Sequence, residues 1–120
     1  MTTPDIIVQR QLDAYNARDI DALMDIYAPD ARQYEHPGKL LASGTAEMRA
    51  RFRLRFQDPI VHARLLQRVV MGNIVIDHEE VSRTLPEGAG VVDTVAIYEV
   101  VDGRIQSGSF QVSKPRLAHA

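Results

Sequence analysis

Four consecutive polar residues interrupt the apolar segment between residues 74 and 84: Asp77, His78, Glu79 and Glu80. Acidic residues are poor strand formers, so their presence marks this segment as a candidate for chemistry. Strand alternation places His78 and Glu80 on one face of the segment, with Asp77 and Glu79 on the other. In an apolar cavity, burial raises the pKa of a carboxyl group and lowers that of an unpaired histidine. The pair of His78 and Glu80 could therefore exchange protons with a ligand.

The same pair also has a purely structural interpretation. Arg64 or Arg68 on the preceding predicted strand could form ion pairs with His78 and Glu80, which would then take no part in chemistry. Perturbed pKa values mark structural networks as well as active sites, so the sequence leaves both interpretations open.

His36 is the second candidate for proton transfer, because imidazole is the side chain that most often changes charge near neutral pH. It precedes Pro37 and could equally be a turn residue facing solvent. Glu35 competes with it for the inward position, since a slip of one residue in register exchanges the two faces of a strand. The sequence does not decide between Glu35 and His36.

Several motifs that would indicate other chemistry are missing from the sequence. The chain contains no cysteine, which excludes disulfides, thiolate metal sites and cysteine nucleophiles. It has no HxH or HExxH spacing, no glycine-rich phosphate loop and no GxSxG elbow. We therefore expect neither a metal nor a cofactor.

Arginine occupies every second position from 49 to 55. On a helix these side chains spread around much of the circumference and form no single stripe. The formal net charge is -2 and aromatic residues make up only 6%, so we expect no nucleic-acid partner. Salt bridges are the expected use of these charges, either with a partner subunit or with nearby aspartates: Asp13, Asp21 and Asp25.

The length of 120 residues fits one domain, which we place at residues 1–120, and the hydrophobic share of 45% is that of a globular protein. The N-terminus does not resemble a signal peptide, and no apolar run approaches the roughly 20 residues that span a bilayer. We expect a soluble cytoplasmic protein without a membrane partner.

Three helices are predicted before the strands. The first runs from Pro4 to about Ala17. The second is capped by Asp19 and ends at Pro29, with an apolar face at helical spacing: Ile20, Leu23, Met24 and Tyr27. The segment 48–56 alternates as a strand would, but its good helix formers favour a third helix from Thr45.

A short extended segment at residues 31–36 precedes this third helix, and four long strands follow it. The strands span residues 60–71, 74–84, 91–101 and 104–113, with turns at Gly72-Asn73 and Asp102-Gly103 and a loop at 85–90. Short connections predict an antiparallel meander, and the helices must cover one of its faces. The sequence therefore predicts an α+β fold in which a long sheet curls into a cone around an internal pocket.

Several segments resemble one family over nearly the whole chain: YNARDIDAL (15–23), YAPDA (27–31), EHP (35–37), SGT (43–45) and AIYEVVDGRI (96–105). They resemble the SnoaL-like and ketosteroid isomerase-like group of the nuclear transport factor 2-like superfamily. The resemblance implies the cone-shaped fold, with about three N-terminal helices on a curved, mainly antiparallel sheet. It also implies a homodimer formed through the outer sheet face, on which Val95 and Ile97 would lie.

The resemblance implies catalytic positions that this sequence only partly fills. The family's general base precedes a proline, where this chain has His36. The two oxyanion donors of ketosteroid isomerases fall on Gln11 and Ala96, so authentic steroid isomerisation is not expected. The resemblance also implies that the strand face bearing His78 and Glu80 lines the pocket.

We therefore expect cofactor-free acid–base chemistry on a small, largely apolar or mixed-polarity ligand, with His36, His78 and Glu80 as catalytic residues. Tyr15 or Tyr34 would polarise a ligand oxygen, although Tyr15 could instead be a packing residue. The other expected ligand-binding residues are Gln11, Met48, Phe52, Ala96, Phe110 and Val112. The alternatives are a ligand-binding protein without a reaction and an assembly module whose cone is filled by its own side chains.

Overall fold

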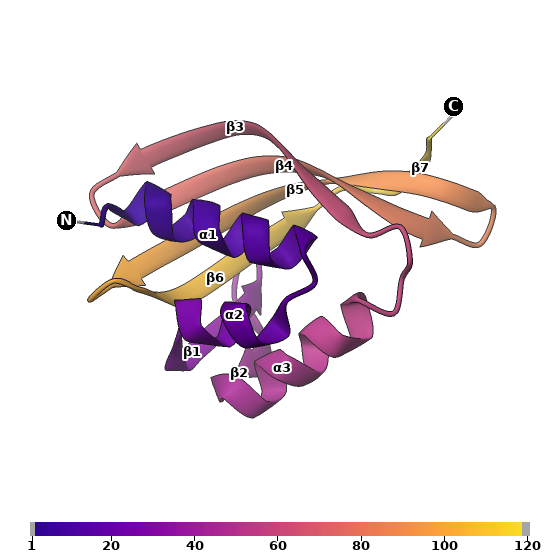
Figure 1. Cartoon of the computed structure of the whole chain (residues 1–120). Coiled ribbons are helices and arrows are strands. Elements are labelled where there is room, and N and C mark those ends of the chain that lie inside the picture. The colour runs from indigo at the N-terminus through magenta and orange to yellow at the C-terminus, as the bar shows by residue number, and fades with distance from the viewer. Residues whose placement is uncertain (1, 119–120) are drawn as a thin grey trace.

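The computed structural model describes residues 2–118, in which three helices cover one face of a curved sheet (Figure 1). The helices are α1 (Pro4–Asn16), α2 (Ile20–Ile26) and α3 (Gly44–Arg55). Asp19 caps α2 as predicted, because its carboxylate accepts a hydrogen bond from the backbone N–H of Ala22 at 3.0 Å. The third helix is also confirmed, since Met48 and Phe52 are buried one turn apart.

The predicted extent of the second helix is wrong at its C-terminal end. The helix ends at Ile26, and Tyr27 already has an extended backbone with φ −84° and ψ 146°. Tyr27 pairs with Ile105 across the sheet and is 1% exposed. Sheet pairing and burial therefore override the helical spacing of this residue.

The sheet has seven strands. They are β1 (Tyr27–Glu35), β2 (Lys39–Ser43), β3 (His62–Met71), β4 (Ile74–Leu85), β5 (Gly88–Val101), β6 (Arg104–Val112) and β7 (Arg116–Leu117). Their order is β2-β1-β6-β5-β4-β3, with β7 paired to β5. The predicted meander from β3 to β6 is confirmed, whereas β2 and β7 were not predicted. Only β1 and β6 pair in parallel among the described strands, so the α+β sheet is mainly antiparallel.

The turn between β5 and β6 has the conformation that its sequence predicts. Asp102 and Gly103 have φ values of 52° and 77°, and a two-residue hairpin turn with both φ values positive matches the twist of the strands. The conformation of this turn thus follows from its own two residues, and the hairpin places β6 beside β1.

The core lies between the helices and the concave face of the sheet (Figure 1). Val8 from α1, Met48 from α3 and Val75 from β4 are completely buried there. On β5, Ala96 and Tyr98 point inwards and are 0% and 3% exposed, whereas Val95 is 37% exposed on the outer face. No helix within residues 2–118 is long and apolar enough to cross a membrane.

Candidate functional site

A cavity of about 360 Å³ opens between the helices and the concave face of the sheet. Its walls come from α1, α3 and strands β1 to β6, and the cavity is large enough to hold a small organic molecule. Five of the predicted ligand-binding residues line it: Gln11, Tyr15, Phe52, Phe110 and Val112. The predicted curved sheet with three helices on one face is therefore confirmed, and the cavity lies between them.

Three other predicted ligand-binding residues lie outside the lining of this cavity. Met48 and Ala96 are 0% exposed and belong to the packed core behind the pocket wall. Tyr34 follows Gln33, which points into the pocket, so alternation turns Tyr34 to the opposite side of β1. The prediction that these three residues line the pocket is wrong.

The predicted orientation of β4 is also wrong. Asp77 and Glu79 are the buried residues of this strand, at 0% and 6% exposure, while His78 and Glu80 alternate with them on the outer face. The register fixes this orientation, because Asp77 and Glu79 pair with Ala96 and Thr94, whose side chains are buried. His78 and Glu80 are therefore not placed to act on a ligand in the cavity.

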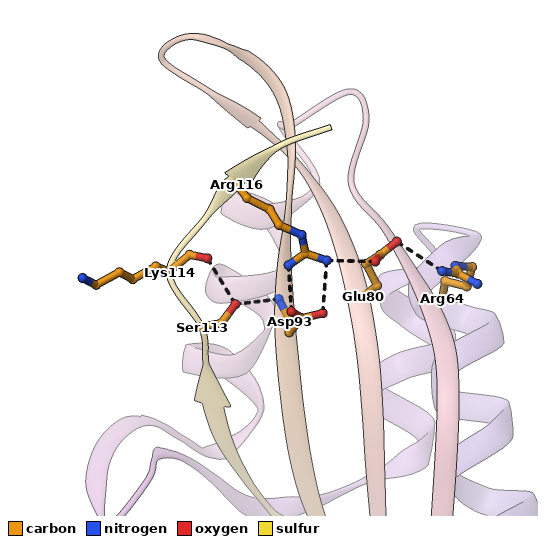
Figure 2. Close-up of polar contacts among 6 residues, drawn as sticks. All are labelled: Arg64, Glu80, Asp93, Ser113, Lys114 and Arg116. Atoms are coloured by element: carbon orange, nitrogen blue, oxygen red, sulfur yellow. Dashed lines mark hydrogen bonds and ion pairs between the residues drawn. The ribbon is translucent and has the colours of Figure 1, made fainter. Parts of the chain in front are cut away.

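Glu80 belongs instead to a network of charges on the outer face (Figure 2). Its carboxylate accepts hydrogen bonds from Arg64 at 3.3 Å and from Arg116 at 3.0 Å. Arg116 also pairs with Asp93 at 2.7 Å, so that the network crosses from β3 to β7. The structural interpretation of Glu80 as an ion-pair partner of Arg64 is thereby confirmed.

The choice between Glu35 and His36 is resolved in favour of Glu35. Glu35 lines the mouth of the cavity, and its side chain is 60% exposed, with Oε2 4.0 Å from Nζ of Lys39. His36 is exposed and lies outside the lining, so the prediction of an inward-facing His36 is wrong. The strand ends at Glu35, and the backbone N–H of His36 donates to the carbonyl of Phe110.

Glu79 is the buried acid in the lining of the cavity. Its carboxyl group has no hydrogen-bond or ion-pair partner within residues 2–118, although the residue is 6% exposed. Burial and, next, the charge of Asp77 raise the pKa of Glu79 to about 7, while Arg68 acts in the opposite direction. A carboxyl group in this state can accept or donate a proton near neutral pH.

Asp77 lies on the same face of β4 and has a different environment. Arg68 donates from Nε and Nη2 to the two oxygens of Asp77 at 2.7 and 2.9 Å, and from Nη1 to Gln9 at 2.9 Å. The hydrogen bonds to Asp77 and, despite burial, the charge of Asp77 raise the pKa of Arg68. Asp77 is therefore a structural ion-pair partner, and Glu79 remains available to a ligand.

Neutral hydroxyl groups surround the same cavity. The hydroxyl oxygens of Tyr27 and Thr94 are buried without a hydrogen-bond partner in the described chain, although Gln33 and Gln11 lie beside Tyr27. The hydroxyl of Tyr98 donates to Oε1 of Gln11 at 3.4 Å. Burial raises the pKa of Tyr27 and of Tyr98, so both stay protonated. Such groups can donate hydrogen bonds to an oxygen that gains negative charge.

Sequence reasoning missed Glu79, Tyr27, Thr94 and Tyr98 as site residues. The odd run of acids on β4 was the available signal, because it drew attention to the right strand. The face of that strand and the end of α2 decide which residues enter the pocket, and both were assigned incorrectly.

Arg18 binds the segment between α3 and β3, which contributes Asp58 to the lining of the cavity. Its guanidinium donates to the carbonyls of Phe56, Asp58 and Pro59 at 2.9 Å each, and to that of Val61 at 3.3 Å. The backbone of Arg18 has a positive φ of 58°, which turns the chain between α1 and α2.

Two further expectations concern charges away from the cavity. Arg49 pairs with Asp21 at 2.8 Å, which confirms one of the expected salt bridges of the arginine-rich helix. Over residues 2–118, no three histidine, cysteine or acidic side chains gather as metal ligands would.

The comparisons with known proteins agree with this fold. The family model of the SnoaL-like domain matches residues 8–108. An uncharacterised protein from Novosphingobium aromaticivorans, described as having a cystatin fold, superimposes with a TM-score of 0.85 at 22% identity, covering 92% of this chain and 99% of its own. No match was found among curated protein sequences.

Two similar structures are described as proposed polyketide cyclases. IdmH from Streptomyces antibioticus has a TM-score of 0.81 at 18% identity, with 93% of each chain covered. A protein from Sinorhizobium meliloti has a TM-score of 0.72 at 25% identity, with 88% of this chain and 93% of its own covered.

Proposed function

Because the chain belongs to the SnoaL-like domain family, we propose that it is a small enzyme using cofactor-free acid–base chemistry on a ligand in the cavity. The observation that carries this proposal is the state of Glu79, a buried carboxyl group with a pKa of about 7 and no partner in the described chain. An acid or base works best when its pKa lies near the working pH. Glu79 takes the role that the sequence had assigned to His36.

The reaction class follows from the groups around Glu79. As a carboxylate it removes a proton from a carbon atom next to a ligand carbonyl. The electron pair of the broken C–H bond forms the C=C bond of an enolate, and the π pair of the carbonyl moves onto its oxygen. The hydroxyls of Tyr27 and Thr94 donate hydrogen bonds to this oxygen. Return of the proton to another atom of the ligand gives an isomerase. Attack of the enolate carbon on a second carbonyl breaks its C=O π bond, and the resulting alkoxide takes the proton from Glu79, which gives a cyclase.

Exchange of the α-hydrogens of small ketones for deuterium tests proton removal without knowledge of the true substrate. NMR spectroscopy would follow a panel of cyclic and β,γ-unsaturated ketones in D2O with wild-type protein, Glu79→Gln and Glu80→Gln. Glu80 is the matched control, because it is the next residue but points outwards. We expect wild type and Glu80→Gln to exchange at similar rates and Glu79→Gln to be slower by about 100-fold or more.

The exchange rate of the wild type should rise with pH and level off above an apparent pKa near 7, which is the pKa of Glu79. Exchange that survives in Glu79→Gln would contradict the assignment. Ketones that bind without any exchange would favour the alternative of a ligand-binding protein.

We also propose that two copies of the chain pair through the outer sheet face. Val69, Ile76 and Ile97 occupy adjacent positions on β3, β4 and β5 there, and Val69 is 47% exposed. An exposed row of apolar side chains of this kind is typical of a surface that another protein chain buries. Sedimentation should report a dimer for wild type and a monomer for Ile97→Glu, with Ile6→Glu on exposed α1 as the control. A monomeric wild type would contradict the pairing.

A further inference from the structure

Three arginines line the cavity on the side where α3 faces β4: Arg51, Arg55 and Arg83. Arg51 and Arg55 lie one turn apart on α3, so both point from the same helix face. Arg83 lies on the face of β4 that also carries Glu79 and Val81. Two elements distant in sequence thus bring three guanidinium groups to one cavity.

None of these three guanidinium groups has a hydrogen-bond or ion-pair partner within residues 2–118. Nη1 of Arg51 and Nε of Arg83 are both buried and unpaired. By contrast, Arg68 pairs with Asp77 at 2.7 Å and Arg49 pairs with Asp21 at 2.8 Å. Leaving a buried charged donor unpaired is costly, so the arrangement favours binding of an anion from outside the chain.

The arginines also repel one another. Burial lowers the pKa of Arg51 and of Arg83, and the charge of Arg55 lowers both further. A guanidinium group nevertheless stays charged at neutral pH, because its ordinary pKa lies far above 7. The repulsion is therefore present in the empty cavity and would be relieved by a negative charge between the arginines.

The acidic groups of the lining offset the charge of the arginines only in part. The charge of Asp58 attracts Arg55 and Arg83. Its carboxylate, however, accepts hydrogen bonds from Thr84 on β4, from Oγ1 at 2.7 Å and from the backbone N–H at 2.8 Å. Glu35 lies at the exposed mouth beside Lys39. Glu79, with a pKa of about 7, is only partly ionised near neutral pH. The lining thus holds three guanidinium groups that repel one another, and a further negative charge bound between them would relieve this repulsion.

We propose that the ligand of this cavity is a small organic monocarboxylate, whose carboxylate Arg51, Arg55 and Arg83 bind and whose apolar body lies against Phe52 and Val112. A planar guanidinium matches a carboxylate with two parallel hydrogen bonds. Because Glu35, Asp58 and Glu79 also line the cavity, a singly charged ligand meets less repulsion there than the double charge of a phosphate ester. The inference rests on the proposed function only in using the same cavity, because it requires binding and no reaction.

Binding of benzoate, benzamide and phenyl phosphate to the whole protein, followed by NMR chemical-shift changes, tests the inference. The three probes share an aromatic body and differ in carrying one negative charge, none, or up to two. We expect benzoate to bind at least about ten-fold more tightly than benzamide and more tightly than phenyl phosphate. Equal affinity for benzoate and benzamide, or tighter binding of phenyl phosphate, would overturn the inference.

Variants locate the binding site. We expect Arg51→Met and Arg83→Met each to weaken benzoate binding by about ten-fold or more, while benzamide binding changes little. Arg53→Met is the matched control, since Arg53 lies on α3 between two of the arginines but is exposed and does not line this cavity. Arg83→Lys keeps the charge but lacks the planar guanidinium group, so its affinity for benzoate should lie between those of wild type and Arg83→Met.

Benzoate affinity that is unchanged in both methionine variants, or equally reduced in Arg53→Met, would contradict the site. Thermal unfolding of each variant shows that it is folded. This binding measurement involves no turnover, so its failure is distinct from a failure of Glu79 to catalyse hydrogen exchange.

Discussion

Asp77 and Glu79 project from the same face of β4, two residues apart, yet only Asp77 has an arginine bound to it. Arg68 contacts both oxygens of Asp77, whereas the carboxyl group of Glu79 faces the cavity without a partner in the described chain. One strand face therefore carries a charged structural acid beside an acid that titrates near pH 7. This contrast can be tested on the stability of the protein as well as on its chemistry.

The first prediction concerns the pH dependence of stability. The pKa of Glu79 is about 7 in the folded chain and 4.5 in the reference state, so the folded state binds this proton more tightly. The resulting stabilisation is fully present below pH 4.5 and is lost as the pH rises to 7, by up to about 3 kcal/mol. Glu79→Gln removes this loss.

Thermal unfolding measured from pH 4 to pH 8 checks the prediction. The Tm of Glu79→Gln should rise relative to that of wild type as the pH increases, and this difference should reach about 5–10 °C at pH 8. Glu80→Gln is the control and should show no such gain, because Glu80 faces the outer network. A constant difference between Glu79→Gln and wild type would show that the pKa of Glu79 is not raised.

The second prediction concerns the Arg68–Asp77 pair. Arg68→Met leaves the carboxylate of Asp77, which is 0% exposed, without its cation and should lower the free energy of unfolding by about 3 kcal/mol or more. The double variant Arg68→Met/Asp77→Leu should recover most of this loss, because no unpaired charge remains. Urea denaturation of the single and double variants measures both values, and equal losses would mean that the unpaired charge is not the cause.

The third prediction concerns the hydroxyl of Tyr27. Because this group is buried without a partner, Tyr27→Phe should leave the free energy of unfolding unchanged or raise it by about 1 kcal/mol. The same variant should slow α-hydrogen exchange by about ten-fold or more, since it removes a donor to the developing oxyanion. Tyr98→Phe should instead lower stability slightly, because its hydroxyl donates to Gln11. A large loss of stability in Tyr27→Phe would show that its hydroxyl has a partner.

The fourth prediction concerns Gly90, where β5 pairs with the short β7. A Cβ atom at Gly90 would lie 2.7 Å from the carbonyl oxygen of Arg116 and would also collide with the side chain of Leu85. Gly90→Ala should therefore cost about 1–3 kcal/mol of unfolding free energy and loosen β7. Gly38→Ala is the matched control, since nothing lies within 4 Å of its Cβ position. Equal stability of the two variants would show that β7 does not pack closely on β5.

Much of the fold could be predicted from the sequence, because caps, turns and apolar spacing within a few residues indicate its helices and strands. The cap at Asp19, the Asp102-Gly103 turn and the apolar spacing of Met48 and Phe52 each act within a few residues. β2 and β7 could not be predicted in this way. They have only five and two residues, which is too short for a clear pattern. β2 pairs with the preceding strand β1, and β7 pairs with β5, which is distant in sequence.

The candidate site was predictable only in part, because β4 does not reveal which of its faces is buried. Its inner face alternates Val75 and Val81 with two acids, while its outer face carries Ile74 and Ile76 with His78 and Glu80. Hydrophobicity is similar on both faces, so it does not show which face of β4 is buried. The burial of this face depends on Arg68, which offsets the charge of Asp77 there. Arg68 comes from another strand, so the sequence of β4 alone does not reveal it.

The four carbonyl contacts of Arg18 have a kinetic consequence for ligand entry. They tie the segment bearing Asp58 to the junction of α1 and α2, so this part of the entrance cannot open without breaking several hydrogen bonds together. Molecules would then be sorted by width at an aperture of fixed size, and not by a loop that closes over them. Uptake should follow a single bimolecular phase whose rate grows in proportion to ligand concentration, without the plateau that a slow opening step imposes.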